Sequence, residues 1–301
     1  MARSSTGSPD LIPQTADTSY GSLEFVDIGD GPPVVFVHGS PGGCDQGALM
    51  TRFLSPTHRV ISVSRPGYLG TPLTGENRTP EQQAAQITDL LSALGVADFG
   101  VMCWSGGGPA AYRLAAALPG RVTSMVAVAA VSTEFDPGAS FRGRLELGEE
   151  KVLFSRLGRW FATTLAEKAP AAAITTLLSG EGDLTRAQAR ELTAGILDDD
   201  DQRDFARALV DTVTGTRKAG FENDFDEFAR LDLPLSSVST PVLLIHAKTD
   251  ADVPYEQSVH ASGALPDARL VGIQLGTHLS AWLGPDASGI QADIVRHLRP
   301  A

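Results

Sequence analysis

The chain has 301 residues, and 42% of them are hydrophobic, which suits one large domain or a domain with a substantial insertion. Its formal net charge of −12 argues against nucleic acid or an anionic membrane surface as a partner, because both attract clustered Lys and Arg. We find no apolar stretch of membrane-spanning length, since Val122–Val131 is only as long as a strand.

The N-terminal residues 1–20 are polar, rich in Ser and Thr, and lack the apolar core of a signal peptide. We therefore expect a flexible tail and a cytoplasmic protein. The two cysteines, Cys44 and Cys103, are too few for a disulfide scaffold, so we expect free buried thiols in a reducing compartment.

Strand and helix patterns alternate along residues 21–131. Thr79 followed by Pro80 predicts the N-cap and first turn of a helix that ends near Leu94. The other elements expected here are the strands 23–28, 34–37, 59–63 and 99–103, the helix 110–118 and the strand 122–131. This alternation predicts an α/β fold with a mostly parallel central sheet and helices on both faces.

Residues 132–239 have a largely helical pattern instead. The candidate helices in this part are 145–157, 159–167, 186–197, 202–213 and 223–231. The alternation then resumes with the strand 241–246, the helix 255–265, the strand 269–274 and the helix 287–298. We therefore expect a core made of residues 21–131 and 240–301, interrupted by a helical cap at 132–239 that covers the strand ends as a lid.

Ser105 lies in a five-residue stretch, Trp-Ser-Gly-Gly-Gly at 104–108, between a buried strand and a helix. A sharp strand-to-helix turn presents a serine hydroxyl, and the free N–H groups of the helix start stabilise developing negative charge. The stretch matches a nucleophile elbow, although Cys103 replaces the first glycine of the usual Gly-x-Ser-x-Gly. A plain glycine-rich connector would look similar, so the assignment depends on partner residues.

Five motifs in one order make the chain resemble the alpha/beta hydrolase family from Leu23 to about His297. They are His-Gly-Ser-Pro-Gly at 38–42, Arg-Pro-Gly-Tyr at 65–68, the elbow, Asp-Ala-Asp-Val-Pro at 250–254 and Gly-Thr-His at 276–278. Within the family the chain is most similar to proline iminopeptidases and cap-bearing esterases. The middle, helical block carries little of the resemblance.

The resemblance implies a catalytic triad. Ser105 would be the nucleophile, and His278, after the last predicted strand, would be the base that takes its proton. Asp250, just past the strand 241–246, would be the acid that orients the histidine.

Other carboxylates could replace Asp250. Asp252 is a rival in the same turn, although it fits a turn-capping role better. Some relatives carry the acid after the strand that precedes the cap, where Glu134 and Asp136 lie.

The resemblance also implies an oxyanion hole and a pocket. The N–H of Gly106, directly after the nucleophile, and that of Ser40 would be the two donors. Residues that could line the substrate pocket are Gly39, Trp104 and Trp160. Acidic cap residues such as Asp224 could bind a substrate amine, but such charges more often face water.

We therefore expect a serine hydrolase that forms an acyl-enzyme on a small or medium ester or amide, with a small-molecule substrate and neither a metal nor a cofactor. A proline iminopeptidase is the closest alternative, although in that group a tryptophan usually follows the serine, whereas Trp104 precedes it. Carbon–carbon bond hydrolases, cofactor-free peroxidases and non-catalytic binding proteins of this fold also stay open. The sequence predicts no oligomeric state.

Overall fold

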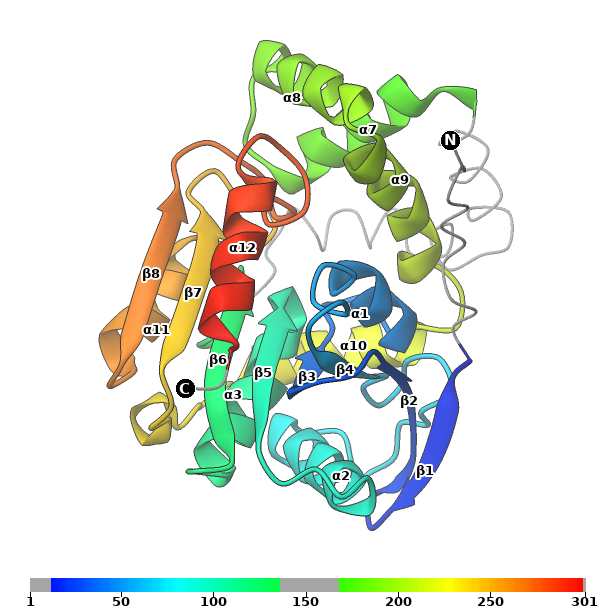
Figure 1. Ribbon diagram of the computed structural model, residues 1–301, viewed down its shortest axis with the longest axis vertical. Helices are drawn as coiled ribbons and strands as arrows, with labels where there is room; N and C mark the ends of the chain where they lie inside the picture. The colour runs from blue at the N-terminus through cyan, green and yellow to red at the C-terminus, as the bar shows by residue number, and fades with distance from the viewer. Residues whose placement is uncertain (1–11, 136–167, 300–301) are drawn as a thin grey trace.

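The computed structural model describes residues 12–135 and 168–299. Within them, eight strands form one sheet in the order β1-β2-β4-β3-β5-β6-β7-β8 (Figure 1). The strands are β1 (Gln14–Thr18), β2 (Gly21–Ile28), β3 (Pro33–Val37), β4 (Arg59–Val63), β5 (Phe99–Trp104), β6 (Val122–Val128), β7 (Val242–Ala247) and β8 (Ala268–Ile273). The β1–β2 and β2–β4 pairs are antiparallel, and the remaining pairs are parallel.

Helices cover both faces of this sheet (Figure 1). They are α1 (Cys44–Met50), α2 (Pro80–Ala93), α3 (Gly108–Ala117), α11 (Glu256–Ala264) and α12 (Ala287–His297). Side chains alternate along a strand, so Val34 and Phe36 of β3 pack with α1 and α12, whereas Val35 and Val37 pack with α2, α3 and α11. The predicted mostly parallel α/β sheet with two helical layers is confirmed.

Between β6 and β7 the described part of the chain holds four further α-helices, and we call them the inserted helices. They are α7 (Pro170–Glu181), α8 (Arg186–Asp198), α9 (Asp200–Leu209) and α10 (Lys218–Phe228). Helices α7, α8 and α9 lie beyond the carboxyl ends of β7 and β8 (Figure 1). Phe205 of α9 stacks parallel to Trp282, with ring centroids 6.2 Å apart, which joins the inserted helices to the segment after β8.

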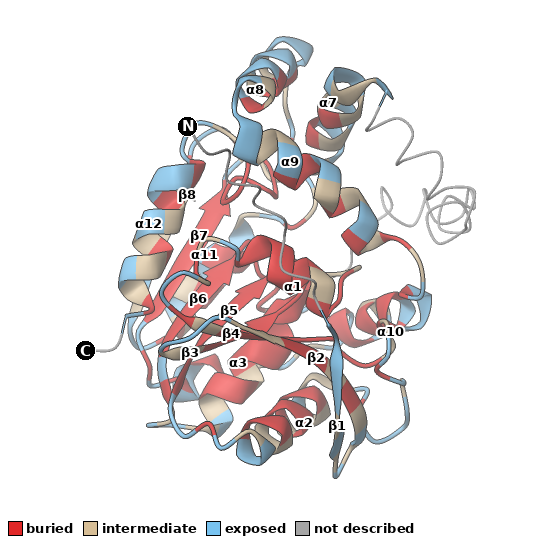
Figure 2. Ribbon diagram, turned by 45° about the vertical axis from the view of Figure 1, so that its right-hand side comes forward, coloured by how far each residue is buried: buried red, intermediate tan, exposed pale blue. Residues whose placement is uncertain are grey.

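The N-terminal region differs from the expected flexible tail at 1–20. Residues 14–18 form β1, which pairs with β2 along its whole length. This edge strand is largely exposed (Figure 2), so its sequence, Gln-Thr-Ala-Asp-Thr, needs no apolar alternation and gives no strand signal. Backbone hydrogen bonds rather than side-chain burial define it.

Two more elements were not expected from the sequence. Helix α1 has only seven residues and begins without a side-chain cap, and α7 has no clear amphipathic period. The predicted helices 145–157 and 159–167 lie outside the described residues. None of the helices within the described ranges is long and apolar enough to cross a membrane.

The start of α2 provides a test of the fold. Thr79 accepts a hydrogen bond from the Gln82 N–H, and the Gln82 side chain accepts one from the Thr79 N–H, as in a capping box. We expect Thr79→Ala to lower the free energy of unfolding by about 1 kcal/mol in chemical denaturation. Thr79→Ser keeps the oxygen and should lose much less; an equal loss in both variants would contradict the capping role.

Candidate active site

Ser105 lies at the turn between β5 and α3, where the chain reverses sharply. Its backbone φ is +53°, a left-handed conformation that costs a residue with a side chain roughly 1–3 kcal/mol. The Ser105 carbonyl accepts a hydrogen bond from the Val131 N–H at 3.0 Å. A Cβ added at Gly107 would lie only 2.3 Å from the Val37 carbonyl oxygen, so glycine lets the turn approach β3 closely. These contacts hold the strained turn in place.

His278 and Asp250 form a buried hydrogen-bonded pair. Nδ1 of His278 lies 2.7 Å from Oδ2 of Asp250, and both side chains are fully buried. The other carboxylate oxygen, Oδ1, accepts hydrogen bonds from the N–H groups of Asp252 and Val253 at 2.9 and 3.0 Å. His246 Nε2 lies 3.1 Å from Oδ2. The Asp250 carboxylate is therefore fixed on several sides and in turn fixes one edge of the His278 ring.

The same contacts set the protonation of the pair. Burial alone lowers the pKa of His278, but the charge and hydrogen bond of Asp250, together with the charges of Asp252 and Glu181, raise it to about 9. Burial alone raises the pKa of Asp250, but the charge of His278 and the hydrogen bonds from His246 and His278 hold it well below its ordinary value. The site therefore stabilises a carboxylate beside an imidazolium, the charge state that forms when the histidine accepts a proton.

The second ring nitrogen of His278, Nε2, is buried and has no hydrogen-bond partner among the described residues. It lies 3.5 Å from Oδ2 of Asp252, which lines the same small cavity as Ser105. Because Asp250 takes up Nδ1, Nε2 is the ring nitrogen that could exchange a proton with another group.

The cavity at Ser105 has a volume of about 30 Å³ and a mostly apolar wall that includes four phenylalanines. Its lining residues are Ser40, Ser105, Val131, Phe135, Phe221, Phe225, Phe228, Asp252 and Val253. The rings of Phe221 and Phe225 lie 4.8 Å apart, and those of Phe135 and Phe228 lie 6.4 Å apart, measured between centroids. This wall favours an apolar group next to the serine hydroxyl.

The two expected oxyanion residues lie next to each other. A Cβ added at Gly106 would be 2.1 Å from Oγ of Ser40, so the loop after β3 abuts the turn at Ser105. His38 supports this loop: its Nε2 accepts a hydrogen bond from the Arg65 N–H at 2.9 Å, and its Nδ1 lies 2.7 Å from the Gly39 carbonyl oxygen. Burial and the charge of Arg65 hold the pKa of His38 well below its ordinary value, so a neutral imidazole holds the loop.

The structure describes two of the three residues that were expected to line the pocket. Trp104 is buried, its Nε1 donates to the His278 carbonyl at 3.2 Å, and its ring centroid lies 4.9 Å from that of His278. A Cβ added at Gly39 would lie 2.6 Å from the Trp104 ring. Neither residue is among those that line the described cavity wall. Trp160 lies outside the described residues.

Neither of the rival carboxylates that the structure describes, Glu134 and Asp252, pairs with Nδ1 of His278. Glu134 is exposed, and Asp136 lies outside the described residues. Asp252 faces the opposite nitrogen, Nε2. The carboxylate hydrogen-bonded to Nδ1 is that of Asp250.

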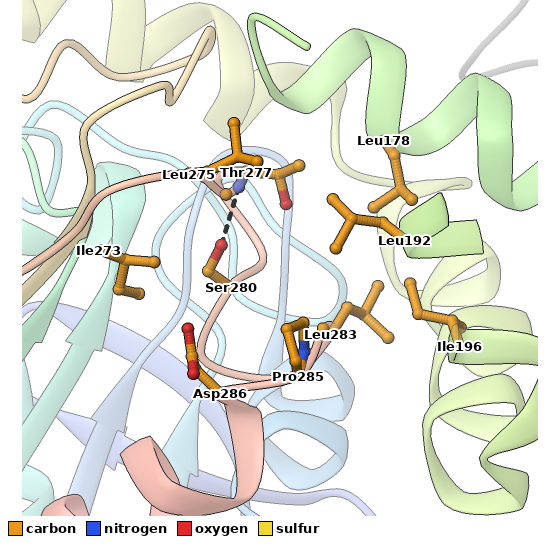
Figure 3. Close-up of a pocket in the computed structure, with 12 residues that line it drawn as sticks. Leu178, Leu192, Ile196, Ile273, Leu275, Thr277, Ser280, Leu283, Pro285 and Asp286 are labelled. Carbon is orange, nitrogen blue, oxygen red and sulfur yellow. Dashed lines mark hydrogen bonds between the residues drawn. The ribbon is translucent and has the colours of Figure 1, made fainter. Parts of the chain in front are cut away.

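A second small pocket, of about 10 Å³, is lined in part by Thr277 and Ser280, which flank His278 in the sequence (Figure 3). Apolar side chains from α7, α8 and the segment after β8 surround it, among them Leu178, Leu192 and Leu283. Ser280 Oγ accepts a hydrogen bond from the Thr277 N–H at 2.7 Å, one residue before His278. This pocket has room for little more than one water molecule, so it belongs to the packing that supports the His278 loop.

No sequence pattern indicates the buried ion pair that lies beside this site. Arg65 and Asp224, which is on α10, are joined by two hydrogen bonds of 2.6 and 2.7 Å, and both side chains are at most 3% exposed. Asp224 therefore does not face water, as acidic helix residues usually do. Within the residues that the structure describes, no cluster of three His, Cys, Asp or Glu side chains could hold a metal ion.

Comparisons with known proteins agree on one family. A model of the alpha/beta hydrolase family matches residues 34–287. The chain is similar to an alpha/beta hydrolase fold protein from Nakamurella multipartita, with 40% identity, a TM-score of 0.87 and coverage of 95% of this chain and 99% of that one. It is 29% identical to the pimeloyl-[acyl-carrier protein] methyl ester esterase of Nitrosomonas europaea, over 83% of this chain and 90% of the relative. An enol-lactonase from Burkholderia xenovorans shares the fold at 16% identity, with a TM-score of 0.67 and coverage of 95% and 99%.

The pKa of His278 provides a direct test of the buried pair. We expect NMR titration to give a value of about 9, and Asp250→Asn to lower it by roughly 2 units because the facing charge is lost. Asp201→Asn, which removes an exposed carboxylate on α9, should leave it unchanged.

The same shift predicts how stability depends on pH. A raised pKa stabilises the folded state fully below the ordinary value of 6.5, and this stabilisation disappears as the pH rises through about 9. An Asp250→Asn variant that keeps the wild-type pKa of His278 would show that the carboxylate does not set it.

Proposed function

The chain belongs to the alpha/beta hydrolase family, and within this family we propose that it is a serine esterase that forms an acyl-enzyme at Ser105. One observation carries the proposal: Asp250 holds one edge of the His278 ring, while the opposite nitrogen is left without a hydrogen bond beside the cavity that Ser105 lines. A base that is oriented on one side and open on the other suits removal of a proton from a hydroxyl.

The proposed reaction starts when the carbonyl carbon of an ester reaches Oγ of Ser105. Nε2 of His278 takes the hydroxyl proton as Oγ bonds to this carbon, which requires the neutral imidazole, and the share of this form rises as the pH approaches the His278 pKa of about 9. The N–H groups of Ser40 and Gly106 stabilise the negative oxygen of the tetrahedral intermediate. The bond to the alcohol oxygen then breaks, and His278 gives the proton to the leaving alcohol. Asp250 stays ionised throughout and stabilises the imidazolium.

The second half of the reaction uses water in place of the serine hydroxyl. His278 takes a proton from the water as it attacks the acyl-enzyme, and returns this proton to Oγ of Ser105 as the acid leaves. The cycle regenerates the enzyme and needs neither a metal ion nor a cofactor.

Two features favour an ester with an apolar acyl group over the amino-terminal proline substrate of an iminopeptidase. The described lining of the cavity includes four phenylalanines, which suit an apolar acyl group. Its one carboxylate, Asp252, lies 3.5 Å from Nε2 of His278 and therefore already faces a histidine, whereas an iminopeptidase needs a carboxylate that faces the substrate amine. A relative with similarity along most of the chain is a methyl ester esterase. A substrate with an anionic acyl group would be repelled by Asp252.

We also propose that the inserted helices act as the cap of the site. Helix α10 supports this role, because Phe221, Phe225 and Phe228 on one of its faces line the cavity at Ser105. The side chains that select the substrate would then come from the insertion and the nucleophile from the core.

The nucleophile is tested first. We expect Ser105→Ala to lower kcat/KM for 4-nitrophenyl butanoate by roughly 10⁴-fold or more, and a fluorophosphonate to form one adduct, on Ser105, detected by mass spectrometry. The matched control is Ser124→Ala, which removes another buried serine hydroxyl, on β6, and should keep full activity.

Other results of this experiment would favour other functions. Faster hydrolysis of proline 4-nitroanilide than of the ester would indicate an aminopeptidase. An unlabelled Ser105 in the folded protein would indicate a binding protein without turnover.

The charge of the acyl group tests the substrate class. We expect the butanoate ester to be preferred over the mono-4-nitrophenyl ester of succinate, and Asp252→Asn to shift the kcat/KM ratio toward the succinate ester by roughly tenfold. Asp252→Asn also changes the pKa of His278, but this change affects the hydrolysis of both esters equally and therefore cancels in the ratio. An unchanged ratio would contradict the proposed repulsion by Asp252.

A further inference from the structure

The loop at residues 38–43, between β3 and α1, is held by two buried charged residues from the insertion. Both Arg217, which precedes α10, and Asp224, within it, are only 2% exposed. We propose that these two side chains are positioning residues that fix the loop, and with it the N–H of Ser40, in the geometry that stabilises the oxyanion. The inference rests on the serine esterase function proposed above.

Asp224 holds the first half of the loop in two ways. Its Oδ2 accepts a hydrogen bond directly from Oγ of Ser40 and another from the Tyr68 hydroxyl at 2.5 Å. The Asp224 carboxylate also accepts hydrogen bonds from both terminal nitrogens of Arg65. Arg65 in turn donates from Nε to the His38 carbonyl and from Nη2 to the Gly39 carbonyl, both at 3.1 Å. One carboxylate therefore fixes three consecutive residues of the loop, directly or through Arg65.

Arg217 holds the second half. Its Nη1 donates to the Gly42 carbonyl at 2.9 Å, and its Nη2 donates to Oδ2 of Asp45 at 2.6 Å. A Cβ added at Gly43 would lie 2.6 Å from Nη1, so the guanidinium packs directly against the loop backbone. Asp224 therefore acts on the residues before Pro41, and Arg217 acts on the residues after it.

The backbone of α10 and of the residues just before it is also joined to the turn that follows β4. The Gly220 N–H donates to the Gly67 carbonyl at 3.0 Å, and the Leu69 N–H donates to the Thr216 carbonyl at 2.9 Å. A Cβ added at Gly67 would lie 2.3 Å from the Gly220 nitrogen, which shows how closely the two backbones approach. Asp224 and Arg217 are therefore presented to the loop from a fixed support.

A role in geometry explains why charges are buried here. Taking a carboxylate and a guanidinium out of water costs nearly as much as their attraction returns, so a buried pair adds little stability over apolar side chains. It does impose directions, because each oxygen of Asp224 and each nitrogen of Arg65 must meet its own partner. Directional contacts matter most where one N–H has to point at a developing charge.

The same helix also contacts the acyl pocket. The helical spacing of residues 221, 224, 225 and 228 places them on one side of α10, and residue 217 directly precedes this helix. Three of them are the phenylalanines of the cavity wall, and two hold the 38–43 loop. The position of α10 therefore sets both the acyl pocket and the oxyanion donor.

The test compares Asp224→Asn with Asp27→Asn. Asp27 makes a bidentate pair with Arg59, at 2.9 and 2.7 Å, in the β2–β4 part of the sheet, so it controls for the loss of such a pair elsewhere. The readouts are kcat and KM for 4-nitrophenyl butanoate, the inhibition constant of butylboronic acid, which forms a tetrahedral adduct on serine, and the melting temperature.

We expect Asp224→Asn to lower kcat roughly 100-fold with KM within about threefold, and to weaken boronate inhibition by a similar factor. Ser40→Ala keeps the N–H but loses the hydroxyl contact to Asp224, and we expect a loss of kcat of roughly tenfold. Asp27→Asn should leave kcat and boronate inhibition within about twofold of the wild type, because only stability is affected there.

The inference is overturned if Ser40→Ala and a folded Asp224→Asn both keep wild-type kcat and boronate inhibition. If Asp224→Asn does not fold, Ser40→Ala alone decides by the same criterion. These outcomes leave the esterase function intact as long as wild-type turnover depends on Ser105. A wild-type enzyme whose turnover is unaffected by Ser105→Ala would overturn the proposed function and this inference together.

Discussion

The carboxyl ends of parallel strands meet at one edge of the sheet, and the candidate site depends on this constraint. Ser40 follows β3, Ser105 follows β5, Asp250 follows β7 and His278 follows β8. In the last pair of strands Ala247 is in register with Ile273, so the chain leaves both strands at the same height. Short loops then suffice to bring a carboxylate and an imidazole within 2.7 Å. The hydrogen-bonded ladder, rather than any local motif, brings distant parts of the chain together.

Much of the core could be predicted from the sequence because its strands are buried on both faces. Such strands are continuous apolar runs, and Arg59–Val63 was predicted with the bounds that the structure gives it. The same reasoning misses β1, whose side chains are mostly exposed, and α1, which has only seven residues. Both elements are stabilised by contacts with distant parts of the fold, and a local pattern of apolar residues cannot reveal such contacts.

Part of the candidate site could likewise be predicted from the sequence, and part of it could not. The order of the motifs along the chain identified Asp250 and His278 as candidates, and in the structure a hydrogen bond joins their side chains. Trp104 was expected near the pocket from its position beside Ser105, but it packs on the ring of His278. The Arg65–Asp224 pair joins a turn and a helix that are far apart in the sequence, and nothing in either segment identifies the partner. Pairings of this kind become visible only when the insertion is seen against the core.

The buried pair also limits how this enzyme could be recombined with its relatives. Exchanging the whole insertion for that of a homologue is an obvious route to a new specificity. A donor segment without a carboxylate at the position of Asp224 would leave the Arg65 guanidinium buried and uncompensated, at a cost of about 3–5 kcal/mol. Chimeras of this scaffold would therefore have to inherit both charges as a unit, or replace both with apolar side chains.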